Sequence, residues 1–323
     1  MPNVTLLNKP ELSLHDVDRK FNDRRTGLVP MIEEYVSKHD LFKGKDVSIY
    51  FIEKGAGSLV AKIETNDEKL ILKVPLSLAF SKGEGLFLKT WENAGVKVPR
   101  VYEEGSFGEL SYILMEYIDA PVITGRYSPE ESLKKKIYVD LGKTLRTMHA
   151  PKAEGFGGVV DGKAEYSRFS DWINGPDMKK RVDYVKEHKL LGTEHGSLST
   201  AYEIMTAHVE SENRSSFCHD DFGTSNIFDT DPITVFDPNP RFNNGYLDLG
   251  RSIVMLATGQ AASQIEQLIE GYFGGEPYNA KALQAAVLIN ATMKLPYSHK
   301  KGRTEMVSNI QKYLADRRSV LEN

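Results

Sequence analysis

Cysteine is almost absent from this 323-residue chain, and the signals of several other protein classes are missing as well. A single cysteine, Cys218, excludes an internal disulfide framework and any metal centre built from several cysteines, so a reducing compartment is expected. No uncharged apolar stretch approaches the roughly 20 residues that cross a bilayer. No basic segment followed by an apolar one opens the chain. These absences predict a cytoplasmic protein that does not enter a membrane.

The chain also lacks an excess of positive charge. It contains 41 basic and 45 acidic residues, a net charge of −4, which argues against a nucleic-acid partner. Residues 1–118 carry 16 basic and 18 acidic groups, and residues 119–323 carry 25 and 27, so neither half is specially acidic. With 40% hydrophobic and 27% charged residues the composition is that of a globular protein, and the length suits two domains.

The first half has the apolar pattern of a small sheet. Three short runs, at 47–52, 59–63 and 70–74, alternate with turn sequences and predict antiparallel strands. Ahead of them, residues 13–39 are predicted to be helical with a break near Gly27 and Pro30.

A helix is expected over residues 82–94, and an apolar strand over 111–118. The remainder is predicted to be mostly helical, with one long helix over 133–148 and a glycine-rich, irregular segment over 151–175. The sequence therefore predicts an α+β fold with a small sheet followed by a larger helical part.

The segment FCHDDFGTSNIFDTDPITVFDPNP, residues 217–240, has the composition of a reactive site. It contains His219, Asp221 and Asn226 in the pattern H-x-D-x-x-x-x-N, and Asp237 after an apolar run. If its two apolar runs pair as a hairpin, Asn226 precedes the first strand and Asp237 follows the second. Both would then lie at the open end, where an amide and a carboxylate oxygen can share Mg²⁺. The structural alternative is a loop of capping polar residues with a buried histidine.

This segment resembles the catalytic loop of the aminoglycoside phosphotransferase and choline kinase family, small-molecule kinases that share the protein-kinase fold. The family pattern H-G-D-x-x-x-x-N appears here with Asp220 in place of the glycine. The resemblance implies that Asp221 is the catalytic base and that Asn226 and Asp237 hold Mg²⁺. Spacing, and not chemistry, selects Asp221 over Asp220. Within the family, the loop looks most like that of hygromycin phosphotransferases.

The family also implies a nucleotide site in the first half. A glycine turn with Gly55, Gly57 and Ser58 would cover the phosphates, and Lys73 in an apolar strand would bind the α- and β-phosphates. Glu84 would hold that lysine. Taken alone, the turn is equally consistent with a structural hairpin, and Lys73 with a solvent-facing side chain.

Two further assignments complete this expected site. Glu92 competes with Glu84 as the partner of the lysine, and Glu84 is also a favourable acid in a first helical turn. At the end of the apolar strand, Glu116 and Ile118 resemble the hinge that binds adenine, through the carbonyl of Glu116 and the N–H of Ile118. The alternative there is a plain strand end.

The resemblance thus implies a bilobal protein-kinase-like fold. Its nucleotide-binding lobe would span residues 1–118, and its catalytic and acceptor-binding lobe residues 119–323. The expected reaction transfers the γ-phosphoryl group of ATP, or of GTP, with Mg²⁺ to a hydroxyl of a small molecule.

The loop resemblance places an aminoglycoside-like acceptor of the hygromycin type first, and with it a role in antibiotic resistance. Choline, a hydroxy amino acid, an amino sugar or a macrolide are alternatives. A protein kinase is disfavoured because no A-P-E anchor follows Asp237, and a non-catalytic pseudokinase because Lys73, Asp221, Asn226 and Asp237 are all present. The sequence gives no indication of the oligomeric state.

Overall fold

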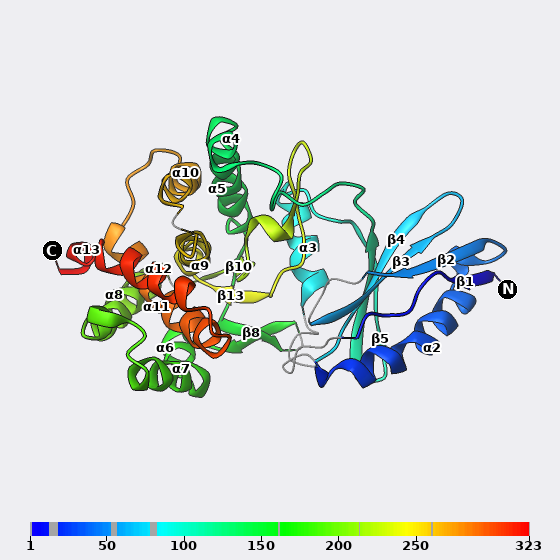
Figure 1. The fold of residues 1–323 in the computed structure, drawn as a ribbon, viewed down its shortest axis with the longest axis horizontal. Coiled ribbons are helices and arrows are strands. Elements are labelled where there is room, and N and C mark those ends of the chain that lie inside the picture. The colour runs from blue at the N-terminus through cyan, green and yellow to red at the C-terminus, as the bar shows by residue number, and fades with distance from the viewer. Residues whose placement is uncertain are drawn as a thin grey trace. The chain divides into compact units, whose positions relative to one another are not determined.

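The computed structural model describes residues 2–12, 19–52, 57–77, 83–160, 162–212, 214–259 and 261–322. It divides into two compact units, unit 1 with Met1–Glu92 and Val98–Ala120, and unit 2 with Asn93–Lys97 and Pro121–Asn323. The predicted α+β fold, a sheet region followed by a mainly helical region, is confirmed (Figure 1). Within the described ranges, no helix has the length and hydropathy needed to span a bilayer.

Unit 1 is built on a six-stranded sheet with the strand order β1-β2-β3-β4-β6-β5. β1 pairs in parallel with β2, and every other neighbouring pair in this sheet is antiparallel. The predicted meander of three strands is confirmed as β2, β3 and β4. The strand bounds are β1 Asn3–Leu6, β2 Asp46–Phe51, β3 Ser58–Glu64, β4 Lys69–Pro75, β5 Val101–Phe107 and β6 Leu110–Glu116.

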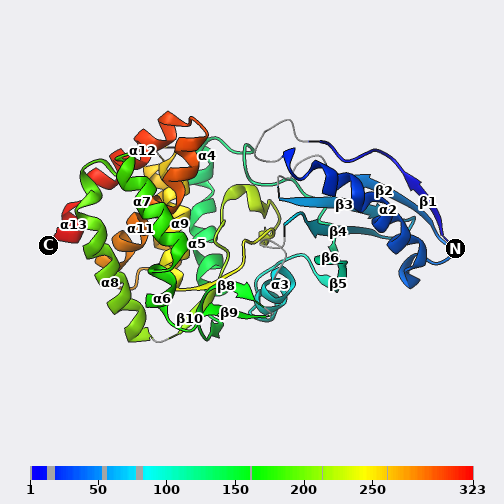
Figure 2. The same ribbon diagram turned by 90° about the horizontal axis from the view of Figure 1, so that it is seen from below.

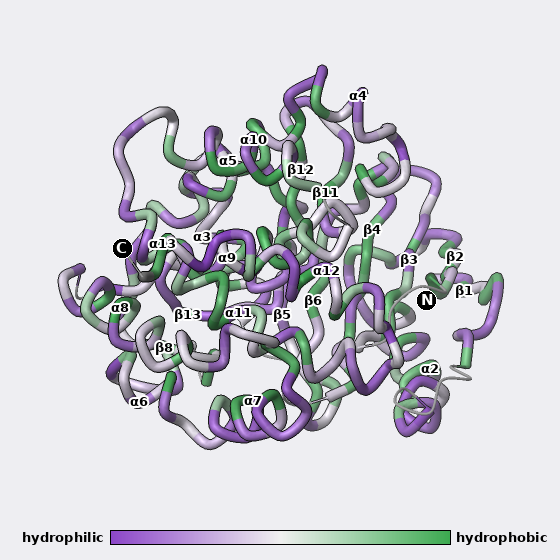
Figure 3. Tube along the Cα trace, turned by 60° about the vertical axis from the view of Figure 1, so that its left-hand side comes forward, coloured by the Kyte–Doolittle hydropathy of each residue, from purple (hydrophilic) through white to green (hydrophobic). Residues whose placement is uncertain are grey.

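Helix α2 (Asn22–Lys38) packs against this sheet through a stripe of apolar residues at every fourth position (Figure 2). The predicted break near Gly27 and Pro30 is wrong, because α2 continues through both residues. Pro30 is exposed, so the hydrogen bond that it removes faces water, and burial of Leu28 and Ile32 outweighs that loss. The rest of α2 is coloured mainly hydrophilic (Figure 3).

Helix α3 (Glu84–Asn93) follows β4 and completes the part of unit 1 that concerns the site. Phe87 and Trp91, one turn apart, are fully buried, with ring centroids 5.6 Å apart in an edge-on contact. Gly95 follows the helix at φ +89°, a conformation that favours glycine. The predicted helix is therefore confirmed, with Glu84 at its first position. The short helix η1 (Asp40–Phe42) lies between α2 and β2.

Unit 2 is mainly helical, and its long helix α11 is buried along most of its length. Helices α7, α8, α9 and α12 all contact α11. The bounds are α4 Pro129–Lys134, α5 Ile137–Met148, α6 Phe169–Ile173, α7 Pro176–Glu187, η2 Gly192–His195, α8 Ser197–Glu212, η3 Thr224–Asn226, α9 Gly245–Ala257, α10 Ala262–Phe273, α11 Ala280–Lys300, α12 Thr304–Ala315 and α13 Ser319–Glu322.

Two features of unit 2 differ from the sequence prediction. The expected single helix over 133–148 is interrupted, because Lys136 has a φ of 54° between α4 and α5. Apolar residues keep their spacing of three and four across this interruption, so the pattern conceals it. The second difference is that residues 151–175, predicted to be irregular, contain β7 (Lys152–Ala153), β8 (Phe156–Val160) and β9 (Lys163–Tyr166).

These three strands join β10 (Ser215–Cys218) and β13 (Arg241–Asn243) in a sheet of order β7-β10-β13-β8-β9. The glycines of residues 151–175 led to the prediction of an irregular segment, but the sheet requires one of these glycines. Gly155 has a φ of +79°, and a Cβ there would lie 2.6 Å from the carbonyl oxygen of Tyr166. The sheet matters for function because β10 leads directly into the loop that begins at His219.

Helices α5 and α10 approach so closely that glycine is needed at their contact. A Cβ at Gly271 would lie 2.0 Å from the carbonyl oxygen of Val139, and one at Gly142 would lie 2.3 Å from that of Leu268. Both obstacles are backbone atoms, so relief would require the helices to separate.

We expect Gly271→Ala to lower the free energy of unfolding by about 2 kcal/mol or more, because the added methyl group forces this separation. Urea denaturation measures the effect. Gly196→Ala is the matched control, since nothing lies within 4 Å of a Cβ at that position, and it should change stability by less than about 0.5 kcal/mol. Equal effects of the two substitutions would contradict the account.

Candidate functional site

The segment between β10 and β13 forms the loop and hairpin that the sequence predicts. β11 (Ile227–Phe228) pairs antiparallel with β12 (Thr234–Val235), with Ile227 opposite Val235. Beyond the two strands, the N–H of Phe236 donates to the carbonyl oxygen of Asn226 at 3.1 Å. Asn226 and Asp237 are therefore brought to the same end of the hairpin, as expected.

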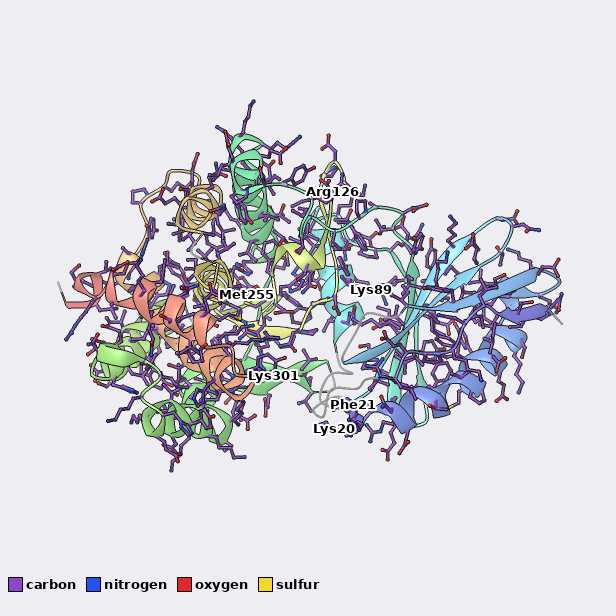
Figure 4. All side chains as sticks on the ribbon, viewed as in Figure 1. Lys20, Phe21, Lys89, Arg126, Met255 and Lys301 are labelled. Atoms are coloured by element: carbon purple, nitrogen blue, oxygen red, sulfur yellow. The ribbon has the colours of Figure 1, made fainter. Side chains whose placement is uncertain are left out.

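The opposite end of the hairpin is tied to the segment that precedes α4. Arg126, labelled in Figure 4, donates through Nε to the carboxylate of Asp229 at 2.7 Å, and the hydroxyl of Tyr127 reaches the same oxygen at 2.7 Å. The N–H of Ile123 donates to the carbonyl oxygen of Ile227 at 3.0 Å. These bonds fix the orientation of the hairpin within unit 2.

A buried carboxylate, Asp248 of α9, holds the start of the loop. It accepts the backbone N–H of His219 at 2.6 Å and that of Asp220 at 2.8 Å. It also pairs with Nε2 of His149 at 3.0 Å. Burial by itself would raise the pKa of Asp248, but the hydrogen bond and charge of His149 and the N–H of His219 outweigh it, and the pKa falls below its usual value. Asp248 is thus a charged acceptor that positions the loop backbone.

The two adjacent aspartates of the loop have different surroundings. Asp220 is buried, and its Oδ2 accepts Nε of Arg241 at 2.7 Å and Nδ2 of Asn239 at 2.9 Å. Asp221 is partly exposed, and its Oδ2 accepts Nδ2 of Asn226 at 3.1 Å. Arg241 therefore neutralises the charge of Asp220, whereas the carboxylate of Asp221 contacts an uncharged amide. Sequence reasoning had not identified Arg241.

The backbone at Asp220 explains the glycine of the family pattern. Its φ is 52°, in the left-handed region that glycine adopts most easily and aspartate tolerates better than most residues. Asp237, after the hairpin, has a φ of 54°. Such conformations are uncommon for residues other than glycine and tend to gather at functional sites.

Asn226 and Asp237 offer oxygen ligands that fit Mg²⁺. Nδ2 of Asn226 donates to the backbone oxygen of Asp221 at 2.8 Å as well as to its carboxylate. This arrangement fixes the amide and leaves Oδ1 as the atom that would bind a metal ion. Asp237 is an exposed carboxylate one residue beyond the Phe236–Asn226 hydrogen bond. One amide and one carboxylate oxygen suit an ion that retains waters and binds phosphates.

His219, His149 and Cys218 serve structural purposes. Nε2 of His219 lies 3.0 Å from the carbonyl oxygen of Phe236, which ties the loop to the hairpin. Both ring nitrogens of His149 are engaged, one by Asp248 and the other by the hydroxyl of Tyr272 at 2.9 Å. Burial raises the pKa of the Cys218 thiol well above its usual value, so it is not a nucleophile.

The atoms of His149, Cys218 and Asp248 lie within 4.8 Å of one another, a spacing that could hold a metal ion. The hydrogen bonds already made by His149 and Asp248 account for this buried cluster without one.

In unit 1, the structure pairs Lys73 with Glu84. Nζ of Lys73, in β4, lies 2.6 Å from Oε2 of Glu84 at the start of α3, and the two side chains are only 8% and 12% exposed. Lys73 thus does not point freely into solvent. The competing acid, Glu92, is exposed. Of the two acids that the sequence left open, Glu84 is the one that meets the lysine.

The remaining expected nucleotide-binding residues lie at opposite ends of two interior strands of the same sheet, β3 and β6. Gly57 accepts the N–H of Leu76 at 2.8 Å, and Ser58 begins β3 opposite Pro75. Gly55 lies outside the described residues.

Glu116 is the last residue of β6, and its N–H donates to the carbonyl oxygen of Arg100 at 2.9 Å. Within the described part of the chain, the N–H of Ile118 forms no hydrogen bond. Glu116 and Ile118 thus lie where strand β6 ends, as the sequence predicted.

Comparisons with known proteins agree with this architecture. The structure matches aminoglycoside phosphotransferase APH(4)-Ia in its ternary complex with AMP-PNP and hygromycin B, with a TM-score of 0.60, 16% identity, and coverage of 91% of this chain and 98% of that one. A putative fructosamine-3-kinase from Haemophilus somnus 129PT matches with a TM-score of 0.57, 13% identity and coverage of 88% and 96%.

Spectinomycin phosphotransferase APH(9)-Ia, in complex with ADP and spectinomycin, matches with a TM-score of 0.53, 14% identity and coverage of 90% and 96%. At these identities the likeness concerns the fold. No curated protein sequence matches the chain. The sequence model of the phosphotransferase enzyme family, however, matches residues 48–282, well over half of the chain. The protein therefore belongs to the phosphotransferase enzyme family and is a small-molecule kinase.

Proposed function

We propose that this enzyme transfers the γ-phosphoryl group of ATP, or of GTP, to a hydroxyl group of a small molecule. The observation that carries the proposal is the arrangement of Asp221, Asn226 and Asp237 at one end of a loop and hairpin, next to a neutralised Asp220. An acceptor for a proton and two ligands for Mg²⁺ are the groups that phosphoryl transfer requires of this part of a kinase.

Residues of unit 1 would bind the nucleotide. Lys73, fixed by Glu84, contacts the α- and β-phosphates, and the turn with Gly55, Gly57 and Ser58 covers them. The hinge would receive adenine through the carbonyl of Glu116 and the N–H of Ile118, a donor with no other hydrogen bond among the described residues. A buried ion pair is costly to form unless its geometry is good, and the 2.6 Å contact meets that condition.

In the transfer step, Asp221 orients the acceptor hydroxyl and takes its proton. The acceptor oxygen forms a bond to the γ-phosphorus while the bond to the β-γ bridging oxygen breaks, and ADP leaves with that electron pair. Asn226 and Asp237 would hold Mg²⁺, which when bound neutralises charge on the phosphate oxygens. His219 and Asp248 act only by holding the loop in place.

The acceptor is a small molecule with a hydroxyl group. The resemblance of the catalytic loop to hygromycin phosphotransferases favours an aminoglycoside-like aminocyclitol, with choline, a hydroxy amino acid and an amino sugar as alternatives. The structural neighbours bound to hygromycin B and spectinomycin agree with the aminocyclitol in chemical class. A panel of these acceptors with ATP, monitored by ADP release and by the mass gain of the acceptor, tests the proposal.

Asp221→Asn should lower kcat by about 10²-fold or more, because the amide cannot take the proton of the acceptor. Thermal unfolding should be nearly unchanged, since Asp221 is partly exposed and has no ion-pair partner among the described residues.

Asp220→Asn is the contrasting variant. It should lower the melting temperature, because it weakens the pairing of half-buried Arg241, and it should retain more activity than Asp221→Asn. If Asp220→Asn abolishes turnover and Asp221→Asn does not, the assignment of the base is wrong.

Lys73→Met should weaken binding of AMP-PNP about tenfold or more, because it removes a charged donor to the phosphates. Fluorescence titration with a labelled ATP analogue measures this effect. Lys89→Met is the control: Lys89 lies on α3, is 48% exposed and pairs with Glu104 (Figure 4). Unchanged nucleotide affinity in Lys73→Met would remove that residue from the site.

A further inference from the structure

Helix α9 presents a third side chain, Arg251, near the two that contact the catalytic loop. Oγ of Ser252 donates to the carbonyl oxygen of Phe222 at 2.9 Å. One turn further, Met255 (labelled in Figure 4) lies against Gly223, where a Cβ would come within 2.7 Å of its methyl carbon. Arg251 stands four positions before Met255 and so on the same face of the helix. Its guanidinium is therefore on the side of α9 that faces the loop.

Arg251 has no acceptor for its charge in the described structure. Its Nε is buried, and no hydrogen bond or ion pair is formed to it by any described residue. The side chain as a whole is half-buried. An arginine is always charged at neutral pH and has five donors in a planar fork, so a buried donor without an acceptor is unfavourable in the protein alone. A bound anion would remove this cost.

A second cation, Lys294 of α11, lies in the same surroundings. Asn290, one turn before it, donates to the carbonyl oxygen of Leu247 at 2.7 Å, so this face of α11 packs on α9. Burial lowers the pKa of Lys294, the positive charge of Arg251 lowers it further, and the negative charge of Asp221 opposes them. Like Arg251, Lys294 forms no hydrogen bond or ion pair with a described residue, and its nearest aromatic contact is the Tyr297 ring at 5.9 Å.

Arg181 of α7 adds a third half-buried cation. Its Nη1 donates to the carbonyl oxygen of Met293 at 2.8 Å, next to Lys294 in the chain. Burial lowers the pKa of Arg181, and the charges of Arg241 and Arg251 lower it as well, so these groups interact electrostatically.

Among the described residues, few acidic groups interact with these cations. Those that interact with Arg181 are exposed Asp177 and Asp220, and Asp220 is already paired with Arg241. Asp221 interacts with Lys294 but must accept the proton of the substrate in the proposed reaction. Positive charge therefore predominates beside the base, although the chain as a whole is acidic.

We infer that the acceptor of this enzyme carries an anionic group, a carboxylate or a phosphate, which Arg251 and Lys294 bind so that a hydroxyl of the same molecule reaches Asp221. The inference rests on the proposed function, because it takes Asp221 as the base. Arg251 suits either anion, since its planar fork matches both. A polycationic aminoglycoside would meet like charges at this position, so this inference places an anionic acceptor ahead of the aminocyclitol that the loop resemblance favours. Of the acceptors that the sequence left open, the hydroxy amino acid has the required carboxylate.

The test compares four sugars that share a hexose ring and differ in charge: glucose 6-phosphate, glucuronate, glucose and glucosamine. Their dissociation constants are measured by calorimetry without nucleotide, at matched ionic strength. We expect at least one anionic sugar to bind about tenfold or more tightly than the neutral and cationic ones. Comparison of glucose 6-phosphate with glucuronate separates the two anions.

Arg251→Gln and Lys294→Met should each weaken binding of the anionic sugar about tenfold, with unchanged circular dichroism. Lys281→Met, on the same helix as Lys294 but exposed, should leave it unchanged. The inference fails if no anionic sugar binds more tightly than glucose and glucosamine. It also fails if the two variants weaken AMP-PNP instead, because the cations would then serve the nucleotide. AMP-PNP binding and ATP turnover by the native enzyme test the proposed function separately, so the two failures can be distinguished.

Discussion

The candidate site depends on one buried carboxylate. Asp248 is removed from water, which is unfavourable for a charge, and this cost is offset by two backbone N–H groups and His149. Because the two N–H groups belong to His219 and Asp220, the hydrogen bonds that stabilise the charge of Asp248 also fix the backbone of the loop. The left-handed conformation of Asp220 is held by these bonds and by Arg241. Asp221 is the next residue in the chain, so these contacts also set the direction in which its side chain leaves the backbone.

A second constraint aligns the expected metal ligands. The hairpin sets Asn226 and Asp237 at one end, and its other end is tied to the chain before α4. The amide of Asn226 in turn donates to Asp221, so a single side chain orients both the proposed metal ligand and the proposed base. The neighbouring residues Asp220 and Asp221 therefore have different electrostatic surroundings, because their hydrogen-bond partners differ. Arg241 neutralises Asp220, while Asp221 accepts an amide N–H of Asn226 and interacts electrostatically with Lys294.

Local sequence predicted the features that depend on neighbours in the chain. The hairpin followed from apolar runs and turn residues. The choice of Asp221 over Asp220 came from spacing and stays a prediction. The ion pair between Lys73 and Glu84 could be anticipated, but only the structure excludes Glu92.

The features that were missed depend on tertiary contacts. Helix α2 continues through Pro30 because it packs on the sheet. Glycine is needed at position 155 because the carbonyl oxygen of Tyr166 leaves no room there for a Cβ. Arg251 and Lys294 are not part of any recognisable sequence motif, although Arg251 lies one helical turn after Asp248. Their meeting beside the loop required the packing of α9 on α11.

Hydrogen exchange at the loop tests the central claim most directly. In the native enzyme the amides of His219 and Asp220 should be protected, and Asp248→Asn should speed their exchange about tenfold or more while phosphoryl transfer is lost. Exchange in the buried part of α11, which belongs to the same unit as the loop, should not change, and this shows that unit 2 of the variant is folded. Native protection at His219 and Asp220 together with native turnover in Asp248→Asn would contradict the account.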